Sequence, residues 1–232
     1  AFAGGGWNVL SRGDDADHRG FRSPRDGALR LTLLSPSARV FLAKRNGGEM
    51  SIEETLAGFG LEPVAGEGAR EMMRLSLFDW AACGIAGVEE PLAAILRAKA
   101  LGEGGAGQAS LIGGGKVPMR AAALVNGAVS HALDYDDTHF AHIGHPSVAV
   151  IPAALAMAEV KGVGTEALID AALVGAEASV RIGLWLGRDH YQIGFHQTAT
   201  AGAFGAALAA GRIAGLGREA LAQALGLAAT RA

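Results

Sequence analysis

The sequence predicts an all-α fold, a bundle of helices, and three observations support this prediction. Half of the 232 residues are hydrophobic and only 19% are charged, which is typical of a chain that buries a large core. From about residue 50 onward, apolar residues recur at three- and four-residue spacings, and no run alternates over the length of a strand. The 35 glycines and many alanines indicate helices that pack closely through small side chains.

The chain divides into two parts near Met50. Residues 1–49 are rich in Arg, Asp, Gly and Ser and keep no helical period. We interpret them as a flexible extension or an upstream sequence read in frame, with a small folded subdomain as the alternative. The segment 51–54, Ser-Ile-Glu-Glu, is typical of a helix start, with a capping serine and acidic groups in the first turn. The helical domain is therefore expected over residues 50–232.

Proline and glycine mark the limits of the expected helices. Pro91 and Pro118 are placed to begin helices, because proline fits the first turn of a helix but not its interior. Gly87 is placed to end the helix before Pro91. Loops are expected over 102–115, where seven of fourteen residues are glycine, and over the polar segment 187–194. The expected helices are, in chain order, 51–58, 67–86, 91–101, 118–134, 148–160, 165–185, 198–214 and 218–232.

The composition argues against several classes of protein. Cys83 is the one cysteine, so the chain has no internal disulfide and cannot alone supply a cysteine cage for zinc or an iron–sulfur cluster. An aromatic content of 6% and a net charge of −3 argue against nucleic-acid binding. No apolar run reaches the ~18 residues that a bilayer span needs, and residues 1–10 lack the basic segment of a secretory signal. We therefore expect a soluble, cytoplasmic protein that binds no membrane.

Residues 126–147 form the most prominent candidate site. Four of the seven histidines lie there, at positions 131, 139, 142 and 145, with three aspartates among them and apolar helices on both sides. Charged groups are costly next to apolar surface unless they are paired, so such a cluster indicates a pocket. If the preceding helix continued far enough, one face would present the polar residues spaced by four, Asn126, Ser130, Asp134 and Thr138.

A metal centre is one interpretation of this segment. The histidines at 139, 142 and 145 are three residues apart, and imidazoles with nearby aspartates suit zinc, iron or manganese. That spacing aligns the ligands on one face only if the segment is helical, and Gly144 and Pro146 argue against a helix there. A metal centre is therefore the less favoured interpretation.

Acid–base catalysis is the favoured interpretation. A helix end that presents Asp134 and Thr138, with a loop that presents His145, would place a carboxylate and an imidazole around one cavity. His196, just before a helix rich in small residues, could add a second imidazole or could simply begin that helix. The remaining possibility is that these histidines and aspartates only cap helices and face solvent.

Several short motifs follow one another in a fixed order along the helical part. They are Asn126-Gly127 with His131-x-Leu133-Asp134-Tyr135-Asp136-Asp137-Thr138-His139, His145-Pro146-Ser147 with Ile151-Pro152-Ala153, Gly175-x-Glu177-x-x-x-Arg181-Ile182-Gly183, Gly194-Phe195-His196-x-Thr198 and Ala224-Leu225-Gly226-Leu227-Ala228. With these motifs the chain resembles the MmgE/PrpD family, which includes 2-methylcitrate dehydratase, cis-aconitate decarboxylase and iminodisuccinate epimerases. The resemblance covers about residues 50–232 and does not extend over 1–49.

The resemblance implies a homodimer that acts on small di- and tricarboxylates without a metal or an organic cofactor. It places Asp134, His145 and His196 among the catalytic groups and Thr138 in the substrate pocket. Members of the family are longer than this chain and have a second, α/β domain. We therefore expect this chain to be a helical domain truncated before that second domain.

A citrate-like trianion needs fixed cations, and in the family lysines of the second domain supply them. In this chain the candidates for substrate binding are Lys116 and Arg181. Arg181 could instead pair with Glu177, four residues earlier on a helix.

Two functions follow from these patterns. The leading hypothesis is a cofactor-independent lyase, a dehydratase or decarboxylase acting on a small polycarboxylate such as 2-methylcitrate or cis-aconitate, with an epimerase as the variant. The second hypothesis is a catalytically silent helical dimerisation fragment, because the carboxylate-binding half would be missing. The residues do not choose between dehydration, decarboxylation and epimerisation, since the same acid–base groups serve all three.

Overall fold

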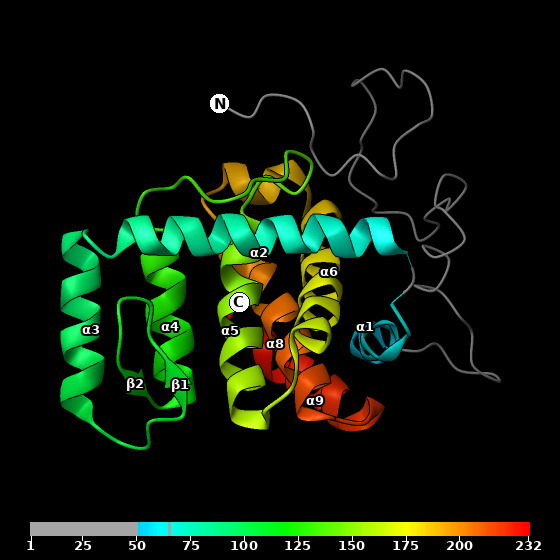
Figure 1. The fold of residues 1–232 in the computed structure, drawn as a ribbon. Helices are drawn as coiled ribbons and strands as arrows, with labels where there is room; N and C mark the ends of the chain where they lie inside the picture. The colour runs from blue at the N-terminus through cyan, green and yellow to red at the C-terminus, as the bar shows by residue number, and fades with distance from the viewer. Residues whose placement is uncertain (1–50, 65) are drawn as a thin grey trace.

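The computed structural model describes residues 51–64 and 66–232, and this part of the chain confirms the all-α prediction (Figure 1). The extension expected over residues 1–49 lies outside the described residues. Among the helices that are described, none combines the length and the hydropathy needed to cross a membrane. The elements are α1 (Ile52–Leu61), α2 (Glu67–Gly87), α3 (Pro91–Glu103), β1 (Ala109–Ser110), β2 (Lys116–Val117), α4 (Met119–Ser130), α5 (Pro146–Lys161), α6 (Thr165–Gln192), α7 (Gln197–Thr200), α8 (Gly202–Ala214) and α9 (Arg218–Ala229).

Helix α1 begins where the sequence predicts, because Ser51 and Glu54 form a complete capping box. Ser51 Oγ accepts a hydrogen bond from the Glu54 N–H at 3.2 Å, and Glu54 Oε2 accepts one from the Ser51 N–H at 3.0 Å. These reciprocal bonds satisfy backbone donors that the start of a helix otherwise leaves without partners. At the other end of α1, Arg212 of α8 donates to the Glu62 carbonyl at 2.9 Å.

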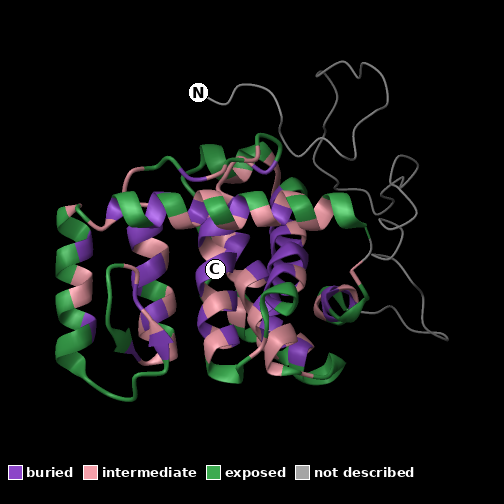
Figure 2. Ribbon diagram, viewed as in Figure 1, coloured by how far each residue is buried: buried purple, intermediate pink, exposed green. Residues whose placement is uncertain are grey.

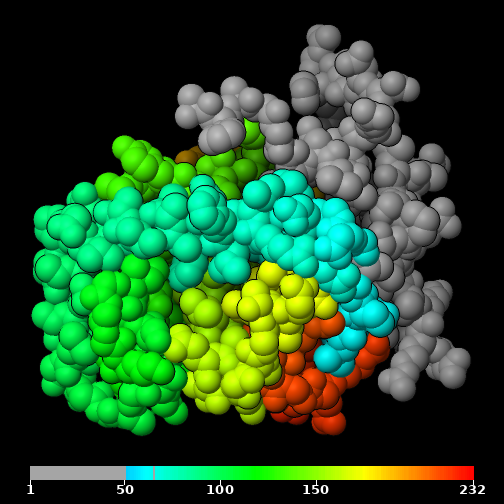
Figure 3. Space-filling view, in the orientation of Figure 1, coloured from blue at the N-terminus to red at the C-terminus, as the bar shows by residue number. Residues whose placement is uncertain are grey.

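Helix α2 lies across the neighbouring helices α3, α4, α5 and α6 (Figure 1). In the space-filling view its side chains form a continuous band over this face of the molecule (Figure 3). Behind that band, α8 packs against both α5 and α6. Helices α5, α6 and α8 therefore pack together in the middle of the domain. The segment that joins α4 to α5 lies at one end of this group (Figure 1).

The main core fills the space between α2, α5 and α6. Met73 and Trp80 of α2, Ile151 of α5 and Ile169 of α6 are almost completely inaccessible to solvent. On α2 exposed residues alternate with buried ones, whereas α5 is buried or half-buried along almost its whole length (Figure 2). Each such large apolar side chain contributes about 2 kcal/mol when it is fully buried. This burial holds the helices that carry the candidate site.

Helices α6 and α8 approach closely because each presents a glycine where they cross. A Cβ on Gly205 would lie 2.4 Å from the Gly175 carbonyl oxygen, and a Cβ on Gly175 would lie 2.6 Å from the Gly205 carbonyl oxygen. Neither position has room for a larger residue. The prediction of close packing through small side chains is confirmed at this crossing.

The helix expected over 118–134 is shorter than predicted, and the polar face expected along it does not form. Helix α4 ends at Ser130, and Asp134 adopts a left-handed conformation with a φ of 57°. A residue with that φ cannot continue a right-handed helix. Asn126 is instead buried in α4, where Oδ1 accepts from the Ile112 N–H and Nδ2 donates to the Ser110 carbonyl, both at 2.9 Å.

Two expected loops contain secondary structure. The loop expected over 102–115 contains one strand of a short antiparallel hairpin, in which Ala109 pairs with Val117 and Ser110 with Lys116. The polar segment 187–194 is mostly helical, since α6 continues to Gln192. The helix is interrupted at Gly187, whose φ of 74° a glycine adopts readily.

Candidate functional site

The segment 131–145 joins α4 to α5, and two hydrogen bonds hold its last part, at His139 and at His145. The His139 N–H donates to the Gly144 carbonyl at 2.9 Å, and the His145 N–H donates to Thr198 Oγ1 at 3.0 Å. Ile143, between these two bonds, has a φ of 55°, which is unusual for a β-branched residue. Asp134 is left-handed too, and the chain reverses so that His145 lies next to His131 and Asp134.

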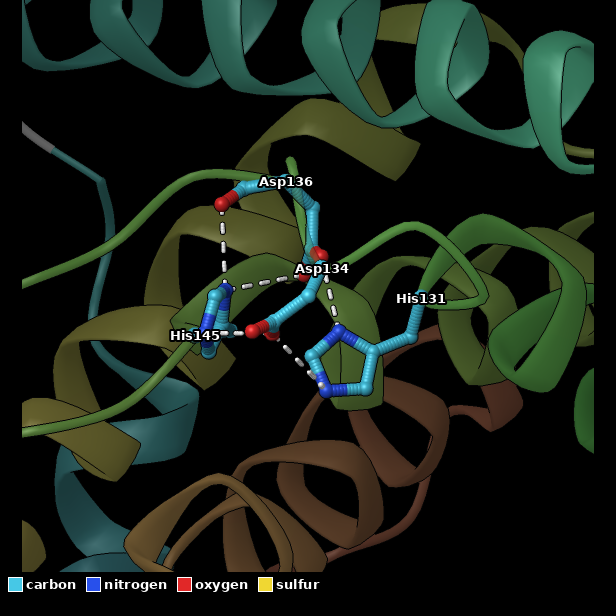
Figure 4. Close-up of side chains that lie close together, drawn as sticks. All are labelled: His131, Asp134, Asp136 and His145. Atoms are coloured by element: carbon cyan, nitrogen blue, oxygen red, sulfur yellow. Dashed lines mark hydrogen bonds and ion pairs between the residues drawn. The ribbon is translucent and has the colours of Figure 1, made fainter.

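Four side chains of this segment converge, and we name them the histidine–aspartate cluster: His131, Asp134, Asp136 and His145 (Figure 4). His131 Nδ1 lies 2.7 Å from Asp136 Oδ1, and His145 Nδ1 lies 3.3 Å from Asp136 Oδ2. On the other edge of the rings, Asp134 Oδ1 lies 3.3 Å from His145 Nε2 and 3.8 Å from His131 Nε2. The two rings meet edge to face, with their centroids 4.8 Å apart.

Asp136 is the buried centre of the cluster, whereas Asp134 forms its exposed edge. The Asp136 side chain is 0% exposed and the Asp134 side chain 76% exposed. Burial alone would raise the pKa of Asp136, but hydrogen bonds with His131 and His145 outweigh it and hold that pKa below its usual value. Asp136 is therefore an ionised carboxylate shared by two imidazoles.

The same carboxylate makes both histidines more basic. The hydrogen bond to Asp136 is the largest cause that raises the pKa of His131, and it raises the pKa of His145 to about 9. In the geometry of the site, the backbone carbonyl of Asp136 accepts the hydrogen bond from His145 Nδ1 at 3.0 Å, and Asp136 Oδ2 lies beside it as an ion-pair partner at 3.3 Å. At neutral pH, His145 therefore carries two protons, with Nδ1–H directed at Asp136 and Nε2–H directed at the exposed edge. Chemically it is a proton donor.

The neighbouring carboxylate, Asp137, serves the fold and does not contact the histidine rings. Its Oδ2 accepts from Ser147 Oγ at 2.5 Å and its Oδ1 accepts from the Ser147 N–H at 3.2 Å, which fastens the first turn of α5. Burial is the largest effect on the pKa of Asp137 and raises it. Because His145 immediately precedes α5, this attachment helps to fix where the His145 backbone lies.

The structure brings two of the predicted site residues together and leaves two others outside the cluster. Asp134 and His145 are members of the cluster, while Thr138 is exposed on the connecting segment. His196 is the residue before α7, and its exposed ring lies against Tyr191 with centroids 5.2 Å apart. Helix α7 still reaches the cluster through Thr198, the acceptor for the His145 N–H.

The two cations predicted to bind substrate lie on other parts of the fold. Lys116 Nζ lies 3.9 Å from Glu159 Oε2, near the last turn of α5, whereas His145 precedes its first turn. A helix of that length separates its ends by about 20 Å. Arg181 pairs with Glu177 and lies over the Phe59 ring at 5.8 Å, so the pairing that the sequence offered as an alternative is formed.

His131 and Asp136 were not among the predicted site residues, although both lie within the motif that suggested the site. Their pairing depends on the chain reversing after α4, and no sequence pattern indicates that Asp134 adopts a positive φ. One signal was available. A carboxylate in an apolar segment must find partners when it is buried, and four histidines lie within nine residues of Asp136, His131 among them.

The cluster also has residue types that bind divalent cations, since one ligand atom from each of its four members lies within 4.8 Å of the others. It differs from the triplet considered from the sequence, because His139 and His142 are not members. Both Nδ1 atoms already face Asp136, so only the two Nε2 atoms and Asp134 face outward. At this outer edge Asp134 Oδ1 lies 3.3 Å from His145 Nε2, so a carboxylate already pairs with the protonated ring there.

Comparisons with known proteins assign the chain to a family. The model of the MmgE/PrpD N-terminal domain matches residues 59–232. Cis-aconitate decarboxylase of Aspergillus terreus is 38% identical over 125 residues, which cover 51% of this chain and 26% of that protein. The cis-aconitate decarboxylase-like protein oryM of Aspergillus oryzae is 32% identical over 166 residues, which cover 67% of this chain and 34% of that protein. The chain thus spans about a quarter to a third of the length of these relatives, and, with the family model matching most of its residues, it belongs to the MmgE/PrpD family.

Proposed function

We propose that this protein is an acid–base lyase domain that acts on a small polycarboxylate, with decarboxylation of a cis-aconitate-like acid as the leading reaction. The observation that carries the proposal is the geometry of His145. Its Nδ1 is held by Asp136, its Nε2 faces the exposed edge of the cluster, and its pKa is raised to about 9. Relatives named cis-aconitate decarboxylase support the choice of substrate class.

The proposed chemistry needs a proton on the carbon framework that remains after carbon dioxide leaves. The bond between that carbon and a carboxylate breaks, carbon dioxide leaves, and the electron pair remains on the allylic carbon framework. His145 Nε2–H then gives its proton to carbon, and the imidazole regains a proton from solvent. Asp136 stabilises the imidazolium before the transfer, as a carboxylate does in a histidine–aspartate pair.

A dehydratase would use the same group differently, because His145 would protonate a leaving hydroxyl instead of carbon. We retain dehydration of 2-methylcitrate as the second reaction, because a protonated imidazole serves either leaving step. His196 and Thr138 are proposed to contact the substrate from outside the cluster. The homodimer, the absence of any cofactor and the cytoplasmic location are proposals that rest on the family resemblance.

A catalytically silent helical module remains the proposal from another class. Its motivation is that the chain spans only a quarter to a third of the length of its relatives. The family's lysine-bearing domain would then have to supply the carboxylate contacts before any turnover is possible.

A product assay separates these proposals. The 232-residue chain, and in parallel the natural open reading frame that contains it, is incubated with cis-aconitate, 2-methylcitrate and citrate in the presence of a metal chelator. We expect carbon dioxide and an unsaturated dicarboxylate from cis-aconitate. His145→Gln should lower turnover by ~10²-fold or more, whereas His190→Gln, a matched change outside the cluster, should not.

Each outcome of this assay has a defined meaning. Product from 2-methylcitrate alone would exchange the leading reaction for the second. Absence of turnover from every acid in both proteins would support the silent module and overturn the enzymatic proposal. His196→Gln tests the other proposed imidazole, and undiminished turnover would remove it from the mechanism.

A further inference from the structure

Another histidine of the same segment has a role that the cluster does not explain. His142 is completely buried, and neither of its ring nitrogens has a hydrogen-bond partner among the described residues. Burial is the largest cause that lowers the pKa of His142 to about 4, with His139 and His145 adding to it. The ring is therefore neutral, with one N–H donor and one acceptor nitrogen. Both are costly to leave unpaired inside a protein.

Gln197 of α7 has the complementary unpaired group. It is also completely buried, and its Nε2 donates to the Gly187 carbonyl at 2.7 Å, while its Oε1 has no partner in the described part of the chain. Gly183 of α6 lies between the two side chains. A Cβ at Gly183 would lie 1.9 Å from His142 Nδ1 and 2.8 Å from Gln197 Oε1. The two unpaired atoms therefore approach the same bare stretch of helix backbone.

Gly144 lies close to both the other edge of the His142 ring and Thr198. A Cβ at Gly144 would lie 3.0 Å from His142 Nε2 and 2.9 Å from the Thr198 backbone nitrogen. The Thr198 N–H, in the first turn of α7, has no acceptor within residues 51–64 and 66–232. Its hydroxyl is already used, because Oγ1 accepts the N–H of His145.

We propose that His142 is a positioning residue for His145. Neither ring nitrogen has a hydrogen-bond partner where the ring lies in the structure, and we infer that a small shift of the ring lets the Nδ1–H tautomer donate to Gln197 Oε1 and accept the Thr198 N–H at Nε2. Only this tautomer matches both neighbours. The Nε2–H tautomer would set two donors against each other at Thr198 and two acceptors against each other at Gln197. We name the contacts of His142 with these two residues the His142 clamp.

The clamp explains how the strained end of the segment is held. Ile143 lies between His142 and His145 with a φ of 55°, a conformation that persists only where the surroundings impose it. On one side of Ile143 the clamp fixes His142, and on the other side the His145 N–H is bound to Thr198. The direction in which the His145 ring leaves the backbone is therefore set by both attachments.

The catalytic consequence rests on the proposed function, in which His145 passes the proton. Loss of the clamp would let Ile143 relax and would displace the His145 ring from Asp136. Small displacements of a reacting group lower turnover strongly, while substrate contacts made elsewhere are retained. The clamp should therefore affect kcat more than KM.

The tautomer is measured directly by ¹⁵N NMR of the histidine rings in the labelled 232-residue chain, with His142→Asn used to assign the His142 signals. We expect a protonated Nδ1 and a bare, hydrogen-bond-accepting Nε2, unchanged between pH 8 and pH 5.5. An Nε2–H tautomer, or a doubly protonated ring within that range, would overturn the clamp. This measurement needs no turnover, so its result stands even if the proposed function fails.

Three substitutions then test the effect on His145 in the product assay described above. Asparagine keeps a donor near the Nδ1 position, glutamine keeps one near the Nε2 position, and leucine keeps none. His142→Leu should lower kcat by about 10-fold with KM changed by less than about 2-fold. His142→Asn should restore most of that loss, and His142→Gln should restore little.

Gln197→Leu provides the reciprocal change. If His142 and Gln197 act as a pair, the double variant should lose no more turnover than either single variant. Multiplied losses in the double variant, or equal kcat values in His142→Leu and His142→Asn, would show that the ring only fills space. Shifted His145 ring signals in His142→Leu, without a change in those of His190, would support the positioning role in the absence of any turnover.

Discussion

His145 and His142 lie three residues apart on one segment, yet their rings have opposite properties. Asp136 and its carbonyl hold His145 and raise its pKa to about 9. His142 is buried near α6 and α7 and pairs with no charged group among residues 51–64 and 66–232, and burial lowers its pKa to about 4. The segment thus supplies one imidazole that is charged at neutral pH and one that is not. The difference comes from the partners of each ring, because the residue type is the same.

The pKa values of the adjacent carboxylates Asp136 and Asp137 are also shifted in opposite directions. Asp136 has two imidazoles as partners and a lowered pKa, whereas Asp137 has the hydroxyl and N–H of Ser147 and a raised pKa. Burial disfavours the charge on both. The partners of Asp136 are imidazoles that also stabilise its charge electrostatically, whereas the donors to Asp137 are neutral and the nearby Asp79 raises its pKa further. Residue type and position in the motif therefore do not reveal that Asp136 pairs with the histidines while Asp137 holds the start of α5.

The largest effect is expected from Asp136→Asn. The amide cannot hold two imidazolium rings, so turnover should fall by ~10²-fold or more, and the free energy of unfolding should drop by about 3 kcal/mol because a buried charge pair is broken. Asp137→Asn is the matched control, since an amide can still accept from Ser147. Its turnover should stay within about 5-fold of the unmodified protein. Equal losses in the two variants would abolish the distinction drawn between them.

The free energy of unfolding should depend on pH through the titration of both His145 and His142. The folded pKa of His145 lies above the ordinary value of about 6.5, so its contribution is fully present below pH 6.5 and is lost as the pH rises through about 9. The folded pKa of His142 lies below 6.5, so the unfolded chain binds a proton that the folded chain excludes. Stability is then lost as the pH falls from 6.5 to about 4. We call these two losses of stability the acid limb, from His142, and the alkaline limb, from His145. Each should lower the free energy of unfolding by on the order of 2 kcal/mol.

Urea unfolding between pH 4 and pH 9.5 measures these two limbs. His142→Asn should flatten the acid limb and leave the alkaline limb, while His145→Gln should do the reverse. Asp137 contributes equally to the variants and cancels in the differences, whereas His131 interacts with His145 and adds to the difference that His145→Gln produces. Parallel curves for all three proteins would contradict the assignment of either limb.

A smaller effect is expected from Gly183→Ala. The added Cβ would meet His142 Nδ1 at 1.9 Å, so the ring or the helix must move, at a cost of about 1–3 kcal/mol. Gly226→Ala in α9 is the matched control, because a Cβ there meets nothing within 4 Å. It should stabilise the helix by up to about 1 kcal/mol. Thermal unfolding of the two variants measures the contrast, and a Gly183→Ala protein as stable as the control would argue against tight packing around His142.

The smallest effect is expected from Lys116→Gln. Lys116 pairs with Glu159 at the end of α5 remote from His145, so its removal should change KM by less than about 2-fold. Steady-state kinetics on the polycarboxylate substrate provide the measurement. A KM raised by 10-fold or more would restore Lys116 to the substrate site and would require a different arrangement of the chain around the substrate.

Much of the fold could be predicted because its signals are local. The capping serine at 51 and the proline at 91 mark helix starts that the structure reproduces. The errors arose where backbone conformation departs from what the residue type favours. Asp134 takes a left-handed φ beyond the end of α4 at Ser130. A second error arose because helix resumes after the left-handed Gly187, where the sequence suggested a loop.

The site could be predicted only in part, for a related reason. The motif identified Asp134 and His145, whose residue types indicate acid–base chemistry. It could not identify Asp136 as the shared partner or His142 as a buried neutral ring, because both depend on contacts made after the chain reverses. His142 meets α6 and α7, about forty and fifty-five residues further along the chain, and no local pattern carries that information.

The ring titrations of His145 and His142, followed in one ¹⁵N NMR experiment on the same protein, test the account most directly. The account predicts that His145 stays doubly protonated until the pH approaches 9 and that His142 stays neutral until the pH falls toward 4. If both rings instead titrated together near pH 6.5, neither the shared carboxylate nor the sealed pocket would exist in solution.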